Sequence, residues 1–293
     1  MSELEAHWLD KEYNALARLA DARRMFDGWA ARSALARAGH VCREGLHFGT
    51  SVAETLDVFP AQRPDAPVLV FIHGGFWRGS DKSLHSFLAP AFVARGAAVV
   101  LLNYGLCPAV AMETIRDQIR QALAWIYRNA RGFNGDPRRL VVAGHSAGAH
   151  LAALMLTQDW PAIAAGLPHD LLQQALCISG LFDLEPIRRT PFLQPDLALT
   201  PESAKALSPT TAPKPHNTVV YTLVGALESA EFQRQNGLLR AHWGDATVPI
   251  CEAIPQRHHF DVLEDMADAG SRLHALAVQL LFTPVQPERL CEP

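Results

Sequence analysis

Continuously apolar runs alternate along the chain with stretches whose apolar residues recur at helical spacing. The apolar runs lie at residues 68–72, 97–102, 139–144, 175–179, 218–224 and 248–254. Strands that are buried on both faces of a parallel sheet have this pattern. The helical stretches lie between or after them, at residues 112–129, 147–157, 230–243 and 261–282. The alternation predicts an α/β fold with a mostly parallel central sheet and helices on both faces.

Two segments depart from this alternation. Residues 12–38 are rich in Ala, Leu and Arg, contain no proline and are followed by Gly39, so they predict an N-terminal helical leader. Residues 183–217 carry seven prolines in 35 residues, which forbids one long helix or strand. A segment this long between regular elements is typical of a small proline-rich lid. We expect residues 1–293 to form a single domain with these two additions.

Composition and charge exclude several classes of protein. Hydrophobic residues make up 49% and charged residues 19%, which is typical of a globular chain. The net charge is −4 without a basic stripe, so no nucleic-acid partner is expected. No apolar run approaches the roughly 20 residues of a membrane span, and the polar start does not resemble a signal peptide. We therefore expect a cytoplasmic protein with no membrane partner.

The cysteines and histidines do not predict a metal site or a disulfide framework. The five cysteines form no C-x-x-C pair and their number is odd. None of the 13 histidines belongs to an H-E-x-x-H motif. No metal and no cofactor are therefore expected.

Residues 144–148 read Gly-His-Ser-Ala-Gly and match G-x-S-x-G. A predicted strand runs directly into this motif and a predicted helix runs directly out of it, as in the nucleophile elbow. The start of the helix would direct free N–H groups and the positive end of its dipole at the reacting centre. The context predicts that Ser146 is a nucleophile, with His145 lining the site beside it.

His-Gly-Gly-Phe-Trp follows the strand at 68–72 and occupies residues 73–77. Attack by a serine creates an oxyanion, which requires N–H donors that already point at it. Successive glycines allow a backbone to turn its amides inward. We expect the N–H groups of Gly75, Phe76 and Ala147 to form this oxyanion hole.

A serine nucleophile also needs a histidine base and a carboxylate that orients it. The base is expected after the last strand, where His258 and His259 are adjacent, and His274 is a weaker candidate in the middle of a predicted helix. Spacing alone does not decide between His258 and His259.

The carboxylate is expected after the strand at 218–224. Glu228 is the first acidic residue there, and Glu231 lies one helical turn further on. Asp183, after the preceding strand, is a further alternative. Glu228 is favoured because it lies in the loop before the helix, whereas Glu231 would belong to the first turn of that helix, where a negative charge is favoured in its own right.

These motifs together resemble the α/β-hydrolase superfamily and, within it, kynurenine formamidase (arylformamidase) and its bacterial relatives. The His-Gly-Gly-aromatic-Trp box is the most specific part, because plain esterases more often carry a third glycine there. The resemblance covers most of the chain through residues 12–14, 29–33, 73–77, 103–104, 133–153, 179–186, 228–235 and 258–260.

The resemblance implies hydrolysis of N-formylkynurenine, or of a similar formanilide, to the arylamine and formate through an acyl-enzyme. In the family the catalytic histidine directly precedes a phenylalanine, which selects His259, and the acid precedes a Ser-x-Glu-Phe stretch, which selects Glu228. Phe76, Trp77 and Tyr104 would offer aromatic surface to the substrate. The pair Arg188–Arg189 is a candidate for contacting a substrate carboxylate.

Two other functions use the same residues. A general carboxylesterase of small aryl or alkyl esters, or another aryl acylamidase, would have the same triad. A non-catalytic ligand-binding member is disfavoured because serine, histidine and acid are all present. The expected partner is a small aromatic amide or ester, and the helix at 12–38 could pack on a second copy in a homodimer.

Overall fold

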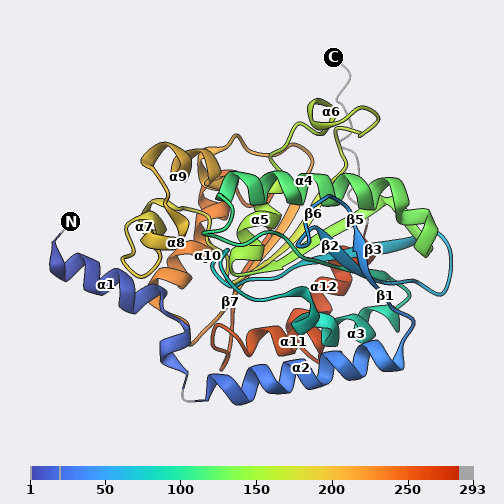
Figure 1. Cartoon of the computed structure of the whole chain (residues 1–293), viewed down its shortest axis with the longest axis horizontal. Coiled ribbons are helices and arrows are strands. Elements are labelled where there is room, and N and C mark those ends of the chain that lie inside the picture. Colours follow the sequence, from blue (N-terminus) through green and yellow to red (C-terminus); the bar gives the residue numbers. More distant parts are fainter. Residues whose placement is uncertain (1, 20, 284–293) are drawn as a thin grey trace.

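A single eight-stranded sheet forms the centre of the computed structural model, which describes residues 2–19 and 21–283 (Figure 1). The strands are β1 (Arg43–His47), β2 (Thr55–Phe59), β3 (Ala66–Ile72), β4 (Ala98–Leu102), β5 (Gly135–His145), β6 (Gln174–Ile178), β7 (Val219–Gly225) and β8 (Ile250–Ile254). They lie in the order β1-β2-β4-β3-β5-β6-β7-β8. β2 is antiparallel to β1 and β4, whereas every pair from β4 to β8 is parallel. The prediction of a mostly parallel sheet is confirmed.

The six strands expected from apolar runs are all present, but β1 and β2 were not expected. β1 has the sequence Arg-Glu-Gly-Leu-His and is mostly exposed at the edge of the sheet, so it has no apolar run. β2 is short and fully buried, but Asp57 interrupts its apolar residues. That carboxylate accepts hydrogen bonds from the Gly45 N–H at 2.8 Å and the Lys82 ammonium at 2.7 Å. These tertiary contacts stabilise the buried Asp57 carboxylate, whose charge hides the apolar pattern of β2 in the sequence.

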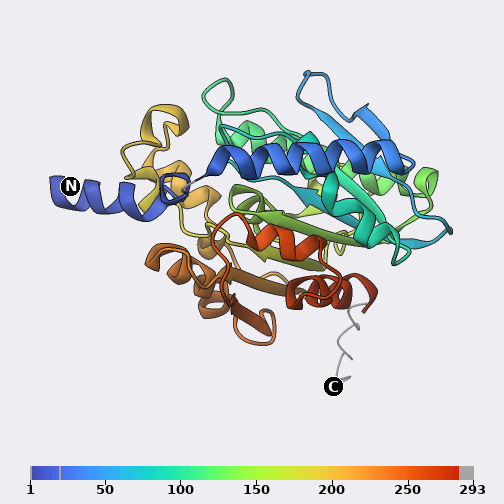
Figure 2. The ribbon, with the colours of Figure 1, turned by 90° about the horizontal axis from the view of Figure 1, so that it is seen from below.

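Helices cover both faces of the sheet (Figures 1 and 2). One face packs against α4 (Met112–Asn129), α5 (Ala147–Met155) and α10 (Ala230–Trp243). The other packs against α2 (Ala22–Gly39), α3 (Ala89–Val93), α11 (Val262–Ala267) and α12 (Arg272–Phe282). Alternate residues of β3 enter the two cores, with Val68, Val70 and Ile72 in the first and Leu69 and Phe71 in the second. Burial on both faces explains why this strand reads as a continuous apolar run.

The single helix expected over residues 12–38 is instead two helices, α1 (Glu3–Tyr13) and α2. Local hydrogen bonds interrupt it, because the Asn14 side chain accepts from the Ala17 N–H at 3.1 Å. Asp21 then caps α2 by accepting from the Arg24 N–H at 3.1 Å. Asn and Asp side chains compete in this way with the helical backbone. The expected helix at 261–282 is divided similarly, because Ser271 caps α12.

The proline-rich segment contains three short helices, α7 (Glu185–Arg188), α8 (Gln194–Leu197) and α9 (Pro201–Leu207). Each carries a proline in its first turn, where the missing N–H costs no intrahelical hydrogen bond. The segment lies beside α1 (Figure 1). Arg189 pairs with Glu5 at 2.5 Å, and the Phe192 N–H donates to Asp10 at 3.1 Å.

No described helix has the combination of length and apolar character that a membrane span requires. Within the described residues, the thiols of Cys42, Cys107, Cys177 and Cys251 are free. Cys291 lies outside the described residues.

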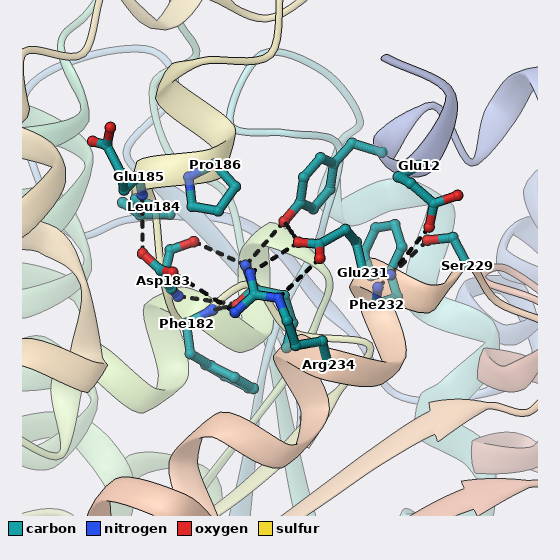
Figure 3. A network of polar contacts seen from close by, with 12 residues as sticks. Glu12, Phe182, Asp183, Leu184, Glu185, Pro186, Ser229, Glu231, Phe232 and Arg234 are labelled. Carbon is teal, nitrogen blue, oxygen red and sulfur yellow. Dashed lines mark hydrogen bonds and ion pairs between the residues drawn. The ribbon is translucent and has the colours of Figure 1, made fainter. Parts of the chain in front are cut away.

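A buried polar network fixes α1 to α10 (Figure 3). The Tyr13 hydroxyl donates to a Glu231 carboxylate oxygen at 2.6 Å and accepts from the Gln235 amide at 3.2 Å. Both nitrogens of the Arg234 fork lie 2.9 Å from Glu231 oxygens. Burial opposes ionisation of Glu231, but hydrogen bonds from Arg234 and Tyr13 outweigh it and lower the pKa of this carboxyl. The N-terminal helix is thus held through the Glu231 carboxylate. That group is buried and depends on the hydrogen bonds of each of its donors.

Replacing Tyr13 by phenylalanine is expected to lower the free energy of unfolding by about 1–3 kcal/mol, because a buried carboxylate loses a donor. Urea unfolding measures this change. Tyr127→Phe is the matched control, since the half-buried Tyr127 hydroxyl has no hydrogen bond within the described residues. An equal loss in both variants would contradict a specific contribution from the Tyr13 contact.

Candidate active site

Ser146 lies at a sharp turn between the central strand β5 and helix α5. Its backbone has φ of 55° and ψ of −118°, a conformation that L-residues rarely adopt. The Ser146 N–H donates to the Ile178 carbonyl at 2.8 Å, which anchors the turn to the end of β6. The strand, strained turn and helix have the arrangement of a nucleophile elbow.

The flanking glycines allow backbone to pack directly on backbone at this turn. A Cβ at Gly148 would lie 2.0 Å from the Ile72 carbonyl oxygen, and one at Gly144 would lie 2.2 Å from the Gly148 carbonyl carbon. Neither neighbour is a flexible side chain that could move aside. The first turn of α5 is therefore held against the ends of β3 and β5 in a way that only glycine permits.

The loop after β3 runs beside the elbow. A Cβ at Gly74 would lie 2.8 Å from the His145 carbonyl oxygen and 3.0 Å from the Ser146 Cβ. Gly75, Phe76 and Trp77 follow with positive φ angles of 103°, 49° and 55°. Three successive residues with positive φ turn the chain away from extended geometry, so their amides have no partners in the sheet.

The N–H groups expected to form an oxyanion hole lie on these two turns. Gly75 and Phe76 belong to the loop after β3, and Ala147 is the first residue of α5. Within the described part of the chain, none of the three donates a backbone hydrogen bond to another residue. They are therefore free to donate to a bound molecule.

His259 and Glu228 form a buried pair. The His259 Nδ1 lies 2.6 Å from a Glu228 carboxylate oxygen, and their side chains are 6% and 0% exposed. The second Glu228 oxygen accepts from the Ser179 hydroxyl and from the Gly225 N–H, both at 2.6 Å. Three donors therefore satisfy a carboxylate that has no contact with water. A carboxylate at Nδ1 leaves the His259 Nε2 available to another partner.

The alternative bases have other partners. His258 lies 3.3 Å from Asp261, and its ring accepts from the Phe260 N–H at 3.2 Å. His274 is buried in α12 and its Nδ1 lies 2.9 Å from the Met266 carbonyl oxygen.

The alternative acids are also engaged elsewhere. Glu231 contacts Tyr13 and Arg234, as described above. Asp183 lies 3.8 Å from Arg234 and accepts from the Glu185 N–H (Figure 3). Of the three acids weighed from the sequence, the structure brings Glu228 to His259.

Ser146 and His259 line the same cavity, which has a volume of about 690 Å³. Aromatic side chains from four separate parts of the chain contribute to its wall. The aromatic side chains are Phe26 and Trp29 from α2, Phe76 from the loop after β3, Phe192 before α8, and Phe260 after His259. Arg78 is the one formally charged side chain among the described residues of the wall.

Two of the aromatic residues expected at the substrate lie in the core instead of at the cavity. Trp77 and Tyr104 are 0% and 2% exposed and do not line the cavity. The Tyr104 hydroxyl donates to the His73 carbonyl at 2.8 Å, and the two rings stack at 4.4 Å. Both side chains belong to the hydrophobic core, whereas Phe76 faces the cavity. His145, by contrast, does line the cavity.

The arginine pair of the proline-rich segment does not line this cavity either. Arg188 pairs with Glu185 at 2.6 Å, and Arg189 pairs with Glu5. Arg78 lines the wall instead, where it is held by the Phe192 carbonyl and Asp196 and lies 5.3 Å from the Phe192 ring. Its position directly after the His-Gly-Gly-Phe-Trp box was the signal that sequence reasoning did not use.

Two of the histidines that line the cavity have lowered pKa values. Burial is the main cause that lowers the pKa of His145 well below its ordinary value, and the nearby His259 lowers it further. Burial is also the main cause that lowers the pKa of His85 to about 3, and the nearby His73 adds to it. These two cavity-lining rings therefore add no positive charge to the cavity near neutral pH.

Comparisons with known proteins agree with this geometry. A family model described as BD-FAE matches residues 56–163. The kynurenine formamidase of Danio rerio is 28% identical over 242 residues, which cover 80% of each chain. Esterase LipQ of Mycobacterium tuberculosis is 31% identical over 241 residues, covering 76% of this chain and 56% of its own.

Solved structures extend the likeness to nearly the whole fold. A candidate thioesterase from Silicibacter sp. TM1040 is 31% identical with a TM-score of 0.80, over 92% of this chain and 98% of its own. An esterase from Pyrobaculum calidifontis, at 16% identity and a TM-score of 0.69, shares the fold. The chain belongs to the α/β-hydrolase superfamily. Within that superfamily it is similar to kynurenine formamidases over most of its length.

Gly148→Ala is expected to destabilise the protein by at least about 3 kcal/mol, or to prevent folding, because the methyl group would overlap a backbone carbonyl. Thermal unfolding and the soluble yield measure the effect. Gly28→Ala is the matched control, since a Cβ there meets nothing within 4 Å and alanine favours the helix by about 0.5–1 kcal/mol. A normal melting temperature for Gly148→Ala would refute the close packing at the elbow.

Proposed function

We propose that this α/β hydrolase removes a formyl group from an arylamine, with Ser146 as nucleophile, His259 as base and Glu228 as its orienting acid. The observation that carries the proposal is one shared cavity. Ser146 and His259 both line it, beside aromatic side chains and backbone N–H groups that have no other partner among the described residues. The similarity to kynurenine formamidases supports the choice of acyl group and leaving group.

The reaction begins when Ser146 Oγ attacks the formyl carbon. The His259 Nε2 takes the hydroxyl proton, and Glu228 stabilises the resulting imidazolium through Nδ1. The carbonyl oxygen becomes an oxyanion that accepts hydrogen bonds from the Gly75, Phe76 and Ala147 amides. Preorganised donors of this kind contribute about 3–4 kcal/mol each to the stabilisation of such a transition state.

Collapse of this intermediate breaks the bond between carbon and nitrogen. His259 returns its proton to the departing nitrogen, so the arylamine leaves in neutral form. The enzyme then carries a formyl ester on Ser146. Water attacks that ester with His259 as base, and formate and the free serine are released.

The aromatic wall suits the aryl part of this substrate. Phe26, Trp29 and Phe192 provide flat apolar surface, on which a ring is bound by burial and by edge-to-face contacts. The cavity of about 690 Å³ falls within the usual range for small-molecule sites. A general carboxylesterase of small esters is the second candidate, favoured by the similarity to Esterase LipQ.

Steady-state hydrolysis of N-formylkynurenine and of p-nitrophenyl acetate separates these two functions. For a formamidase we expect a kcat/KM of about 10⁴ M⁻¹s⁻¹ or more on the formamide. Ser146→Ala is expected to lower kcat by about 10⁴–10⁶-fold on either substrate without loss of folding. Turnover of the ester alone would make the protein an esterase, and activity that survives Ser146→Ala would refute the proposed nucleophile.

Arg78 is expected to favour aryl formamides that carry a carboxylate. Two matched substrates test this, N-formylanthranilate and formanilide, which differ by that single group. Arg78→Met is expected to raise KM for the anionic substrate by about 10-fold or more, as for loss of a charge-assisted hydrogen bond, and to leave KM for formanilide within about 2-fold. Arg188→Met is the control, because Arg188 does not line the cavity. An equal change with both substrates would mean that Arg78 only supports the wall.

A further inference from the structure

The side chain of His145 contacts the backbone of the residue proposed as the base. Its Nε2 lies 2.6 Å from the His259 carbonyl oxygen, and the two rings are 4.7 Å apart. Within the described residues, no backbone N–H donates to that carbonyl. Among the described residues, His145 is therefore the hydrogen-bond donor to the His259 carbonyl, and His259 itself is buried.

The chemistry of the contact assigns the tautomer of His145. A carbonyl oxygen can only accept a hydrogen bond, so Nε2 carries the hydrogen. The ring is neutral because it is fully buried and lies beside His259. A neutral imidazole has one N–H, and His145 uses it for this contact. The remaining Nδ1 lies on the side of Gly74, where a Cβ would be 3.2 Å away.

This hydrogen bond joins the end of β5, which leads into Ser146, to the loop that carries His259. His145 is the last residue of β5 and directly precedes Ser146, whereas His259 lies in the loop between β8 and α11. Hydrogen bonds near the end of β7 also anchor this loop, where the Leu227 N–H donates to the Arg257 carbonyl at 2.9 Å and Glu228 contacts His259. A tether from the side of β5 therefore limits how far the loop can move away from Ser146.

We propose that His145 is a positioning residue and not a residue that binds substrate. Through the main chain of His259 it keeps the ring of that residue close enough to Ser146 to accept its hydroxyl proton. The proposal rests on the catalytic roles proposed above for Ser146 and His259. It does not depend on the acyl group, because any ester or amide cleaved by these residues needs the same approach of base and nucleophile.

Two substitutions separate the hydrogen bond from the bulk of the side chain. His145→Leu fills the site but has no donor, whereas His145→Gln places an amide N–H near the position of Nε2. We expect His145→Leu to lower kcat by about 10–100-fold with KM within about 2-fold, as a displacement near 1 Å would. His145→Gln is expected to recover most of this loss. Both effects should be equal on the formamide and on p-nitrophenyl acetate.

A matched control reports on stability alone. His274 is also buried and its Nδ1 contacts a backbone carbonyl, that of Met266, but it lies in α12 and does not line the cavity. His274→Leu is expected to lower the melting temperature about as much as His145→Leu while kcat stays within about 2-fold of the wild type. If His145→Leu does not fold, His145→Asn replaces it, because the shorter side chain does not reach the His259 carbonyl.

Three results would overturn the proposal. A raised KM with unchanged kcat would mean that His145 contacts the substrate. Unchanged kcat and KM in His145→Leu, or in His145→Asn where it replaces that variant, would mean that the hydrogen bond does not position the base. Failure of His145→Gln to recover activity, with normal folding, would remove the role of the donor. Because the ester reports on His145 even when the formamide is not cleaved, failure of the substrate assignment remains distinguishable.

Discussion

The contact of backbone on backbone beneath Ser146 is the constraint on which the rest of the site depends. Gly148 lies so close to the Ile72 carbonyl that no side chain fits between α5 and the end of β3. This approach holds the strained turn at Ser146 and places the first amide of α5 beside the loop that begins at His73. A rigid scaffold of this kind lets a site keep unfavourable backbone angles, because the surrounding strands and helix leave the turn no alternative. The turn at Ser146 and the position of the candidate oxyanion donors are thus two results of a single packing contact.

A second constraint is the burial of Glu228. A carboxylate that has no contact with water is costly unless hydrogen bonds replace its hydration. Ser179, Gly225 and His259 supply three donors from the ends of β6 and β7 and from the loop after β8. Two of them hold one oxygen, which directs the other toward the histidine ring. The carboxylate is therefore oriented by the sheet itself, and His145 anchors the same histidine loop from the side of β5. The pair of Glu228 and His259 is thus held on both sides before any substrate binds.

The cavity differs from this rigid centre because its wall is assembled from distant parts of the chain. Helix α2 contributes Phe26 and Trp29, and the proline-rich segment contributes Phe192. α1, α10 and Asp183, just before α7, are joined around Glu231 and Arg234 by the polar network of Figure 3, so the leader and the proline-rich segment meet at the same end of the sheet. Variation in these additions can alter the substrate without disturbing the turn at Ser146, which is the general relation between a fold and the site that it carries.

The sequence by itself determined the parallel core and the elbow at Ser146, and it favoured Glu228 over Glu231 and Asp183, because each depends on local order: apolar runs, glycines at fixed offsets, and the first acid after a strand. It did not reveal β1 and β2, whose charged residues are compensated only by tertiary contacts such as that between Asp57 and Lys82. It placed Trp77 and Tyr104 at the substrate, although side-chain direction at a turn depends on backbone angles that neighbouring residues impose. Only the tertiary structure decided which aromatic rings surround the cavity and that His145 contacts the loop of His259. Those contacts join residues far apart in the chain, and no local pattern encodes them.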